Sequence, residues 1–391
     1  MNALDTMNKA LKVHKKDLIA LSKDLHTNPE LSGEEYRSME RICSFLEARG
    51  FKNIEKGIGN LPTAFRAIKK IGDGEAVRVA FCAEYDALPD LGHACGHNLI
   101  AGASVTAGLL LSLCEAPPAF EVTIIGTPDE EVRGGKIDLI QAGVFDGLDL
   151  AMMFHPGFGT KINVRSLACR SWEFTFYGKN AHAAAEPIEG RNALDGVILT
   201  FTNINALRQY LKDDVRIHGI IKDGGKASNI IPDLAVAEIC IRSNDNKYLL
   251  EVEQRVMDCA RGAALASGTE VEITQFGNFY DAMISNPVLV ELFKESLNDI
   301  GFVDVSRQTE GLGSIDMGNV SRIVPAIHPV LALTDKMIPG HTEGFADLCN
   351  TDKAYEVMLE AGKAMALTAY KVISSPELRS KMMKDFKRQN K

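Results

Sequence analysis

The sequence lacks the features that mark several broad classes of protein. No two of its eight cysteines form a CxxC pair, and 43 lysines and arginines are outnumbered by 52 aspartates and glutamates, for a net charge of −9. The longest nearly uncharged apolar stretch, 99–113, is broken by glycine and serine and is shorter than the roughly 18 residues that span a bilayer. These absences argue against a disulfide scaffold, a nucleic-acid-binding protein and a protein that inserts into or binds to membranes.

What remains is an ordinary globular composition. The chain has 391 residues, of which 46% are hydrophobic and 24% are charged, and this length suits two domains, with three possible. Cysteines such as Cys82 and Cys240 lie inside apolar strand-like runs, where a thiol behaves as a small buried hydrophobe. The first 28 residues form a charged amphipathic pattern and not a secretory signal. We therefore expect a cytoplasmic protein in a reducing environment.

The first third of the chain alternates between short apolar runs and helical patterns. The apolar runs cover 77–83, 122–126 and 148–154, and the helical patterns cover 11–25, 33–49, 99–113 and 136–142. Short apolar strands separated by helices indicate a parallel sheet that is covered on both faces. We therefore expect an α/β domain here.

The pattern changes near residue 166. Trp172, Phe174 and Phe176 alternate with polar residues, which is the period-two signature of a half-exposed strand. The following patterns complete the order β-α-β-β-α-β, which is typical of a ferredoxin-like unit. Helix and strand signals resume at Pro287, and a long helix is expected over 352–372. The simplest architecture is one α/β domain interrupted by a smaller α+β domain.

Chemically active side chains stand directly after each apolar run of the first domain. They are Glu84, Asp86 and the stretch Gly92-His93-Ala94-Cys95-Gly96-His97-Asn98 after the first run, Asp129-Glu130-Glu131 after the second, and His155 after the third. Since ligands bind in open α/β sheets outside the carboxyl ends of the strands, these groups should converge on one edge. Carboxylates, imidazoles and a thiol gathered there would repel one another or stay unpaired without a cation. The pattern therefore predicts a metal site.

Each of these groups of residues, taken alone, also has an interpretation that needs no metal. A single histidine after a strand, such as His155, is usually a satisfied polar residue, and a pair such as Glu130-Glu131 is usually solvated or opens a helix. No GxSxG elbow, phosphate-binding loop or GxGxxG motif is present to support a serine hydrolase or a nucleotide cofactor. Catalysis by the thiol of Cys95 itself is an alternative chemistry. The conjunction at three strand ends favours the metal site.

The histidine-cysteine-histidine stretch is the strongest of these pieces. Its glycines favour a turn before a helix that is capped by Asn98. In that geometry Cys95 and His97, two positions apart, can both face one ion.

Several motifs follow one another through the chain in a specific order. They are Ala83-Glu84-Tyr85-Asp86-Ala87-Leu88-Pro89, Gly92-His93-Ala94-Cys95-Gly96-His97, Pro128-Asp129-Glu130-Glu131, Gly178-Lys179-Asn180-Ala181-His182-Ala183, Ser228-Asn229-Ile230-Ile231-Pro232-Asp233 and Gly340-His341-Thr342-Glu343. Together they resemble the amidohydrolase branch of the aminoacylase and glutamate-carboxypeptidase di-metal peptidase family. That branch includes aminobenzoyl-glutamate hydrolases, hippurate hydrolases, auxin-conjugate hydrolases and aminoacylase-1-like dipeptidases. The resemblance covers essentially the whole chain.

The resemblance implies a role for each matching residue. The ligands of a two-metal site would be Cys95, His97, Glu131, His155 and His341. Glu130 would be the general base acting on a metal-activated water, and Asp86 would orient the ligands. His182 belongs to the inserted domain, which in relatives brings this imidazole to the partner's active site, and we expect it to stabilise the oxyanion. Asn229 and Arg242 would help to hold a substrate carboxylate or the reacting carbonyl.

The resemblance also implies the architecture. Residues 1–167 and 281–391 would form a di-metal exopeptidase-type catalytic domain, with a mixed sheet covered by helices. Residues 168–280 would form an inserted ferredoxin-like dimerisation (lid) domain, so a homodimer is expected. Asn98 and Asp129 stand where many relatives have Asp and Ala, which leaves the exact substrate open.

The expected activity is hydrolysis of the amide bond of a small N-acyl amino acid or dipeptide. Aminobenzoyl-glutamate-type and Xaa-Lys-type dipeptidase specificities are alternatives within this activity, and a non-catalytic protein that binds metal or a small ligand is an alternative outside it. The expected cofactor is a pair of divalent ions, zinc or manganese, with nickel or cobalt possible, because a mixed sulfur, nitrogen and oxygen ligand set suits several metals.

Overall fold

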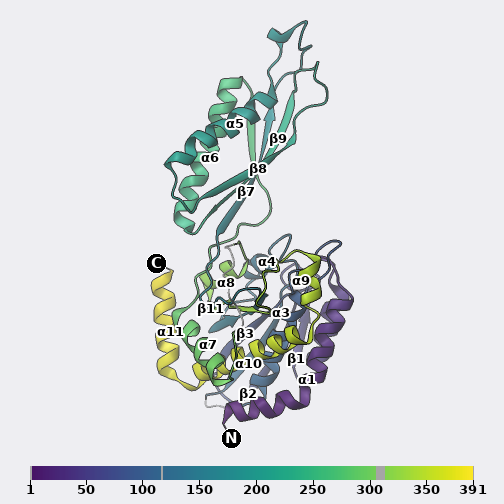
Figure 1. The fold of residues 1–391 in the computed structure, drawn as a ribbon. Coiled ribbons are helices and arrows are strands. Elements are labelled where there is room, and N and C mark those ends of the chain that lie inside the picture. The colour runs from purple at the N-terminus through teal and green to yellow at the C-terminus, as the bar shows by residue number, and fades with distance from the viewer. Residues whose placement is uncertain (1, 116–117, 305–312, 391) are drawn as a thin grey trace. The chain divides into compact units, whose positions relative to one another are not determined.

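The computed structural model describes residues 2–115, 118–304 and 313–390. The chain divides into two compact units, drawn as a ribbon in Figure 1. Unit 1 comprises Met1–Arg165 and Met283–Lys391, and unit 2 comprises Ser166–Ala282. Within the described ranges no helix is long and apolar enough to cross a membrane.

The main sheet of unit 1 is mixed. Its strands, in spatial order, are β1 (Lys52–Lys56), β2 (Phe65–Ile71), β4 (Phe120–Gly126), β3 (Val77–Ala83), β5 (Leu150–Met152) and β11 (Ala326–Ile327). β3 is parallel to β4 and β5, as the apolar runs predict, whereas β2 is antiparallel to both β4 and β1. The main sheet is therefore mixed, as the resemblance implies, and its central strands have the parallel pairing that the apolar runs predict. β1 and β2 carry exposed or half-buried lysines and have no continuous apolar run that would reveal them.

Helices cover both faces of this sheet. The helices of unit 1 in the described ranges are α1 (Ala3–Thr27), α2 (Tyr36–Glu47), α3 (His97–Ser112), α4 (Gly135–Gln141), α7 (Pro287–Asp299), α8 (Met317–Ile323), α9 (Glu343–Leu348), α10 (Asp352–Ser374) and α11 (Pro376–Gln389). Alternate residues of β3 belong to different hydrophobic clusters, with Val79 and Phe81 on the side of α3 and α10, and Ala80 and Cys82 on the side of α4 and α8. This two-sided burial explains why the strand reads as one apolar run.

A second, two-stranded sheet of unit 1 consists of β6 (His155–Gly157) and β12 (Val330–Ala332). The two strands are parallel, and His155 pairs with Val330. β6 follows β5 closely along the chain, so His155 stands just beyond the carboxyl end of the main sheet.

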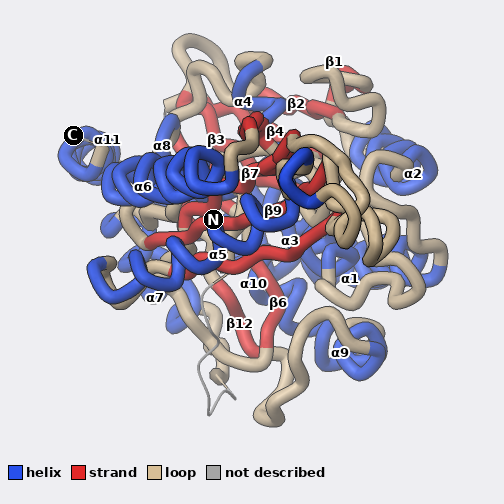
Figure 2. The backbone as a smooth tube through the Cα atoms, turned by 90° about the horizontal axis from the view of Figure 1, so that it is seen from above, coloured by secondary structure: helices blue, strands red, loops and turns tan. Residues whose placement is uncertain are grey.

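Unit 2 has the order β-α-β-β-α-β. Its elements are β7 (Ala168–Tyr177), α5 (Ala193–Leu207), β8 (Arg216–Asp223), β9 (Leu234–Ser243), α6 (Asn246–Ser267) and β10 (Glu270–Gln275), with short 3₁₀ helices η1 (Pro187–Glu189) and η2 (Arg208–Tyr210). The sheet order is β10-β7-β9-β8, and all neighbours are antiparallel. α5 and α6 lie side by side (Figure 2) and bury Phe174 and Phe176 of β7 against one face of the sheet. This is the ferredoxin-like topology that the sequence predicts.

Candidate metal centre

The ends of the central strands position the polar side chains of unit 1. Glu84 and Asp86 follow β3 directly, and Glu130 and Glu131 follow β4 after a short turn. Parallel neighbours place both segments at the same edge of the sheet. His155 joins them from the start of β6.

The helix that carries His97 begins two residues earlier than expected. Gly96, in the left-handed region at φ 80°, is the residue before α3, and a Cβ there would lie 2.4 Å from Pro156. Only glycine combines that backbone angle with such a close approach. Asn98 is therefore not the cap, and its buried amide donates instead to Ser22 Oγ at 3.2 Å and to the carbonyl of Cys349 at 3.3 Å.

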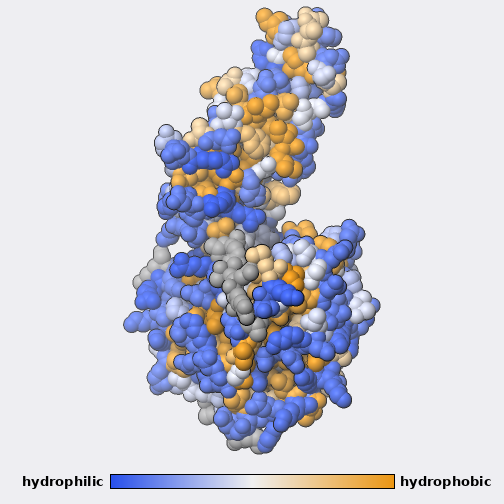
Figure 3. Space-filling view, viewed as in Figure 1, coloured by the Kyte–Doolittle hydropathy of each residue, from blue (hydrophilic) through white to orange (hydrophobic). Residues whose placement is uncertain are grey.

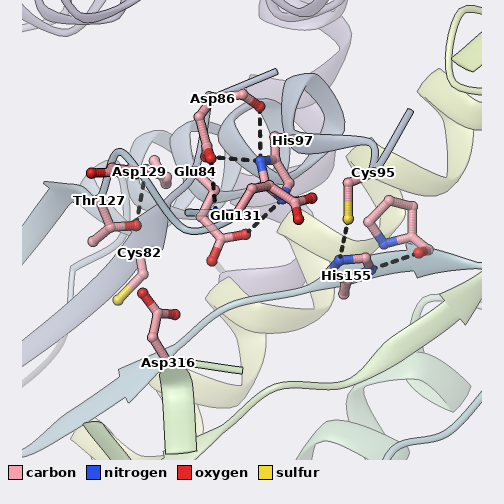
Figure 4. Close-up of polar contacts among 12 residues, drawn as sticks. Cys82, Glu84, Asp86, Cys95, His97, Thr127, Asp129, Glu131, His155 and Asp316 are labelled. Atoms are coloured by element: carbon pink, nitrogen blue, oxygen red, sulfur yellow. Dashed lines mark hydrogen bonds and ion pairs between the residues drawn. The ribbon is translucent and has the colours of Figure 1, made fainter. Parts of the chain in front are cut away.

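The structure brings the five predicted ligands together as two groups of three that share one sulfur. Cys95, His97 and His155 form one group, and Cys95, Glu131 and His341 form the other; within each group the candidate ligand atoms lie within 4.8 Å of one another. Figure 4 shows Cys95 beside His155, with Sγ to Nε2 at 3.5 Å, and Glu131 facing His97. Two cation positions with a common thiolate are the arrangement these groups can form.

His341 reaches this site from a distant part of the sequence. Its backbone N donates to the carbonyl of Ala94 at 2.8 Å, which places it beside Cys95, and its Nε2 lies 3.3 Å from Glu131 Oε1. Its φ of 62° is in the left-handed region, which a non-glycine residue adopts at a cost. This strained backbone directs the imidazole toward the other ligands.

The buried donor set fits divalent cations. Among the described residues, the buried atoms Nε2 of His97 and Oε1 of Glu131 make no hydrogen bond of good geometry, although Glu84 Oε2 lies 3.5 Å from the first and His341 Nε2 lies 3.3 Å from the second. Burial raises the pKa of the Cys95 thiol well above its ordinary value, so a nearby cation is needed to keep it as a thiolate. Buried polar atoms without partners are costly, and a cation bound by sulfur, nitrogen and oxygen would satisfy all three.

Glu130 stands next to this donor set. One of its carboxylate oxygens lies within 4.8 Å of ligand atoms of His97 and Glu131. Burial, together with the charges of Glu84 and Asp316, raises the pKa of Glu130 well above its usual range. A buried carboxyl group of this kind holds a proton more readily than an exposed one, which suits a group that accepts and returns protons.

The turn before Glu130 is held by a buried carboxyl group. Asp129 has a φ of 60°, and its backbone N donates to Oε1 of Glu35 at 3.0 Å. The same oxygen accepts from the N–H of Gly33 at 2.9 Å, and the other accepts from Thr63 Oγ1 at 2.7 Å. Glu35 is fully buried and fixes a turn that carries two site residues.

Sequence reasoning missed a buried ionic network beside the site. The ammonium group of Lys136 donates to Glu84 Oε1 and to Asp316 Oδ1, the latter at 2.8 Å. The position of Glu84 directly after an apolar run could be read from the sequence. Asp316 is 180 positions away from Lys136, and no sequence pattern around Asp316 indicates that the two residues meet. Two buried histidines lie nearby: His328, whose ring centroid is 5.6 Å from that of His155, and His93, which stacks on His26.

In unit 2 the predicted residues lie at two different ends of the sheet. His182 forms a β-bridge with Ile230, and the carbonyl of Asn229 accepts from the N–H of Ala183 at 2.9 Å. Nδ1 of His182 accepts from the N–H groups of the two residues that follow Ala183, which leaves Nε2 as a proton donor. Arg242 instead pairs with Cys169 near the other end of the ten-residue strand β9, about 30 Å away. The structure therefore brings His182 and Asn229 together but not Arg242.

Comparison with known proteins gives a consistent result. Residues 80–365 match Peptidase family M20/M25/M40. The chain is 40% identical over 383 residues to the Xaa-Arg dipeptidase of Mus musculus, covering 94% of this chain and 88% of the relative. It is 32% identical over 313 residues to one of the subunits of p-aminobenzoyl-glutamate hydrolase from Escherichia coli, covering 75% of this chain and 64% of that one. A dinuclear metal-binding peptidase of the M20 family from Bacillus subtilis shares the fold, with a TM-score of 0.70 at 19% identity over 92% of this chain and 99% of that one.

Proposed function

Because this chain belongs to peptidase family M20/M25/M40 and is a metal-dependent amidohydrolase, we propose that it cleaves dipeptides that end in a basic residue. The proposed metal-dependent hydrolysis is supported by the close approach of the five candidate ligands. They form two groups that share the sulfur of Cys95, and Glu130 lies beside them. The similarity to the mouse Xaa-Arg dipeptidase, over nearly the whole of both chains, supports the substrate class. N-acyl amino acids are the second substrate class within the same activity.

The five converging side chains would hold two divalent cations. Cys95, His97 and His155 would bind one, and Cys95, Glu131 and His341 the other. When bound, such ions supply Lewis-acid chemistry, which makes water more acidic and polarises the amide carbonyl. Zinc suits the thiolate and imidazole ligands and manganese suits the carboxylate ligand, and nickel or cobalt would also fit this set.

Glu130 would serve as the proton carrier of the reaction. Its carboxylate, next to His97 and Glu131, accepts a proton from the attacking water and returns it to the leaving amine. The neighbouring Glu131 keeps its backbone fixed through a hydrogen bond from its N–H to Asp86 Oδ2 at 3.1 Å. One glutamate is thus held as a ligand while its neighbour remains available for proton transfer.

Unit 2 would complete the site of a second copy of the chain. Nε2 of His182 is an exposed donor that suits the amide oxygen as it gains negative charge. His182 lies at the end of the sheet opposite Ala168 and Tyr280, near which the chain enters and leaves unit 2, which supports a role in another subunit. Asn229 beside it, and Arg242 at the other end, are proposed to bind the substrate.

A homodimer formed through unit 2 is part of this proposal. β8 is an edge strand, and its Ile220 and Ile221 are 59% and 46% exposed, as is Ile198 of α5 at 46%. Figure 3 shows hydrophobic side chains on the visible face of unit 2. An exposed edge strand with apolar side chains is suited to pairing with another copy. A reducing cytoplasm also fits, since all eight cysteines are free and Cys95 needs its thiolate.

The experiment is a hydrolysis panel on the metal-loaded protein and on two variants. Xaa-Arg, Xaa-Lys, N-acetyl amino acid and aminobenzoyl-glutamate substrates are assayed with zinc, manganese, cobalt or nickel, and after treatment with a chelator. We expect the highest kcat/KM on Xaa-Arg dipeptides and loss of activity on chelation. Glu130→Gln should lose about a thousandfold or more in kcat while still binding two ions per chain.

Glu360→Gln is the matched control, because Glu360 is a partly buried carboxylate on α10 outside the ligand groups. It should keep the full rate. A metal-loaded Glu130→Gln that turns over at the native rate would refute the assigned base. Chelator-insensitive turnover that alkylation abolishes would instead support thiol catalysis.

A further inference from the structure

Unit 1 contains a buried lysine that is not part of the proposed ligand set. Lys136 is the second residue of α4, and its side chain is fully buried. Its ammonium group donates to Glu84 and Asp316, and its backbone N donates to Asp316 Oδ2 at 3.1 Å. Because an unpaired ammonium is very costly to bury, these carboxylates are its counter-ions.

The two counter-ions form a cluster with the proposed base. Carboxylate oxygens of Glu84, Glu130 and Asp316 lie within 4.8 Å of one another, and we call these three residues the acidic cluster. Three carboxylates at this separation repel one another strongly in a site with little water. The ammonium of Lys136, bonded to two of the three, offsets that repulsion and determines where they stand.

Glu84 links the lysine to a proposed ligand. Its Oε1 accepts from Lys136, and its Oε2 lies 3.5 Å from Nε2 of His97 (Figure 4 shows Glu84 beside His97). A carboxylate that is bound at one oxygen by a fixed donor cannot rotate freely at the other. The lysine therefore controls the direction in which Glu84 faces His97.

We propose that Lys136 is a positioning residue for hydrolysis: by binding Glu84 and Asp316 it keeps the acidic cluster, and with it the base, in working geometry. The lysine acts through these carboxylates and needs no contact with substrate. The proposal rests on the proposed function, in which Glu130 is the base.

The test compares Lys136→Met, which removes the charge and keeps the length, with Lys136→Arg, which keeps the charge. Rates are measured on folded, metal-loaded protein with an Xaa-Arg dipeptide, or with the best substrate of the panel. We expect Lys136→Met to lower kcat about tenfold or more while KM changes by less than about threefold. Lys136→Arg should recover a measurable part of kcat, and the wild type and both variants should bind two ions per chain.

A purely structural lysine would give a different result. Both variants would then lose thermal stability, but kcat of the folded fraction would equal that of the wild type, and this outcome overturns the proposal. If Lys136→Met does not fold, the double variant Lys136→Met/Asp316→Asn removes one uncompensated charge, and we again expect a low kcat. A native kcat in that folded double variant also overturns the proposal.

Lys371→Met is the control for loss of a lysine ion pair in the same unit. Lys371 is partly exposed and lies 2.8 Å from Asp299, outside the site, so its replacement should leave kcat unchanged. The experiment distinguishes failure of the proposed function from failure of the proposed role of Lys136. A fully active Glu130→Gln contradicts the proposed function, whereas a fully active Lys136→Met beside an inactive Glu130→Gln contradicts only the role of the lysine.

Discussion

Oδ1 of Asp86 accepts a hydrogen bond from Nδ1 of His97 at 2.9 Å, and both side chains are almost completely buried. Burial alone would raise the pKa of Asp86, but the charge of His97 and this hydrogen bond together hold that pKa at about 2. The carboxylate is therefore ionised at neutral pH, and the imidazole carries its proton on Nδ1. Nε2 is left to face Glu84 Oε2 at 3.5 Å and Glu131 Oε1 at 3.9 Å.

Replacing Asp86 should weaken metal binding more than it weakens folding. Asp86→Asn keeps the size of the side chain but loses the charge that orients His97, so we expect cation affinity to fall about 10–100-fold. Titration of the metal-free protein with zinc or manganese measures the change. Ser32→Ala removes another hydrogen bond to Asp86, at 2.8 Å, and leaves the bond to His97, so its effect should be smaller. Equal losses in both variants would contradict the orienting role.

The buried carboxyl group of Glu35 should make stability depend on pH. Burial raises its pKa from 4.5 to about 7, so folding favours the protonated form. The resulting stabilisation is complete below about pH 4.5 and is lost as the pH rises to about 7, a change of about 3 kcal/mol. Glu35→Gln cannot ionise and should lack this contribution.

The measurement is urea unfolding of the wild type and Glu35→Gln between pH 4.5 and 8, with chelator present to remove the pH dependence of metal binding. The free energy of unfolding of the wild type should fall relative to that of the variant as the pH rises. A constant difference across this range would show that Glu35 does not titrate in the folded protein with a raised pKa.

Two glycine-to-alanine substitutions in helices should have opposite signs. At Gly362 of α10 a Cβ would lie 2.7 Å from the carbonyl oxygen of Ala103 on α3, so Gly362→Ala should destabilise by roughly 1–3 kcal/mol. At Gly262 of α6 a Cβ would meet nothing within 4 Å, so Gly262→Ala should stabilise by roughly 0.5–1 kcal/mol. Thermal unfolding measures both. Stabilisation at Gly362 would mean that α3 and α10 do not pack this closely.

Mixing two inactive variants tests whether the sites are shared between subunits. If His182 serves the partner's site, His182→Ala and Glu130→Gln chains that exchange subunits form heterodimers with one complete site each. Random pairing then recovers up to about a quarter of the wild-type activity. The contrary outcome is a mixture whose activity, once subunit exchange has been verified, equals only the sum of the activities of the two separate variants. That result would mean that His182 acts in its own chain's site or outside catalysis.

The fold was predictable where one local pattern determined burial. Val77–Ala83 is buried on both faces, so its apolar run predicted β3 with its observed bounds. β1 and β2 lie at the edge of the sheet and keep polar residues such as Lys69 and Lys70, so they lacked that signal. The helix expected over 352–372 ends close to the observed end of α10 at Ser374, whereas α11 was missed, although proline at the first helical position is a known helix start.

The residues of the candidate site could be predicted where polar side chains directly follow a strand. They could not be predicted where segments that are distant in the sequence come together. Glu130, Glu131 and His155 stand at such ends, whereas Asp316 reaches Lys136 across 180 positions with no periodic signal. The start of α3 was misplaced because asparagine is a common cap, while the positive φ of Gly96 cannot be read from the sequence. The resemblance implied a substrate-binding role for Arg242, but its position on β9 separates it from Asn229.

The sulfur of Cys95 belongs to both ligand groups, so chemical damage to this one atom would affect both cation positions. Oxidation of Cys95 to a sulfinic acid would convert a soft donor into a hard one for both cation positions at once. Peroxide damage would therefore release the two ions together and not one after the other. Bound ions would in turn shield the sulfur, so that resistance to oxidants would depend on how fully the protein is loaded.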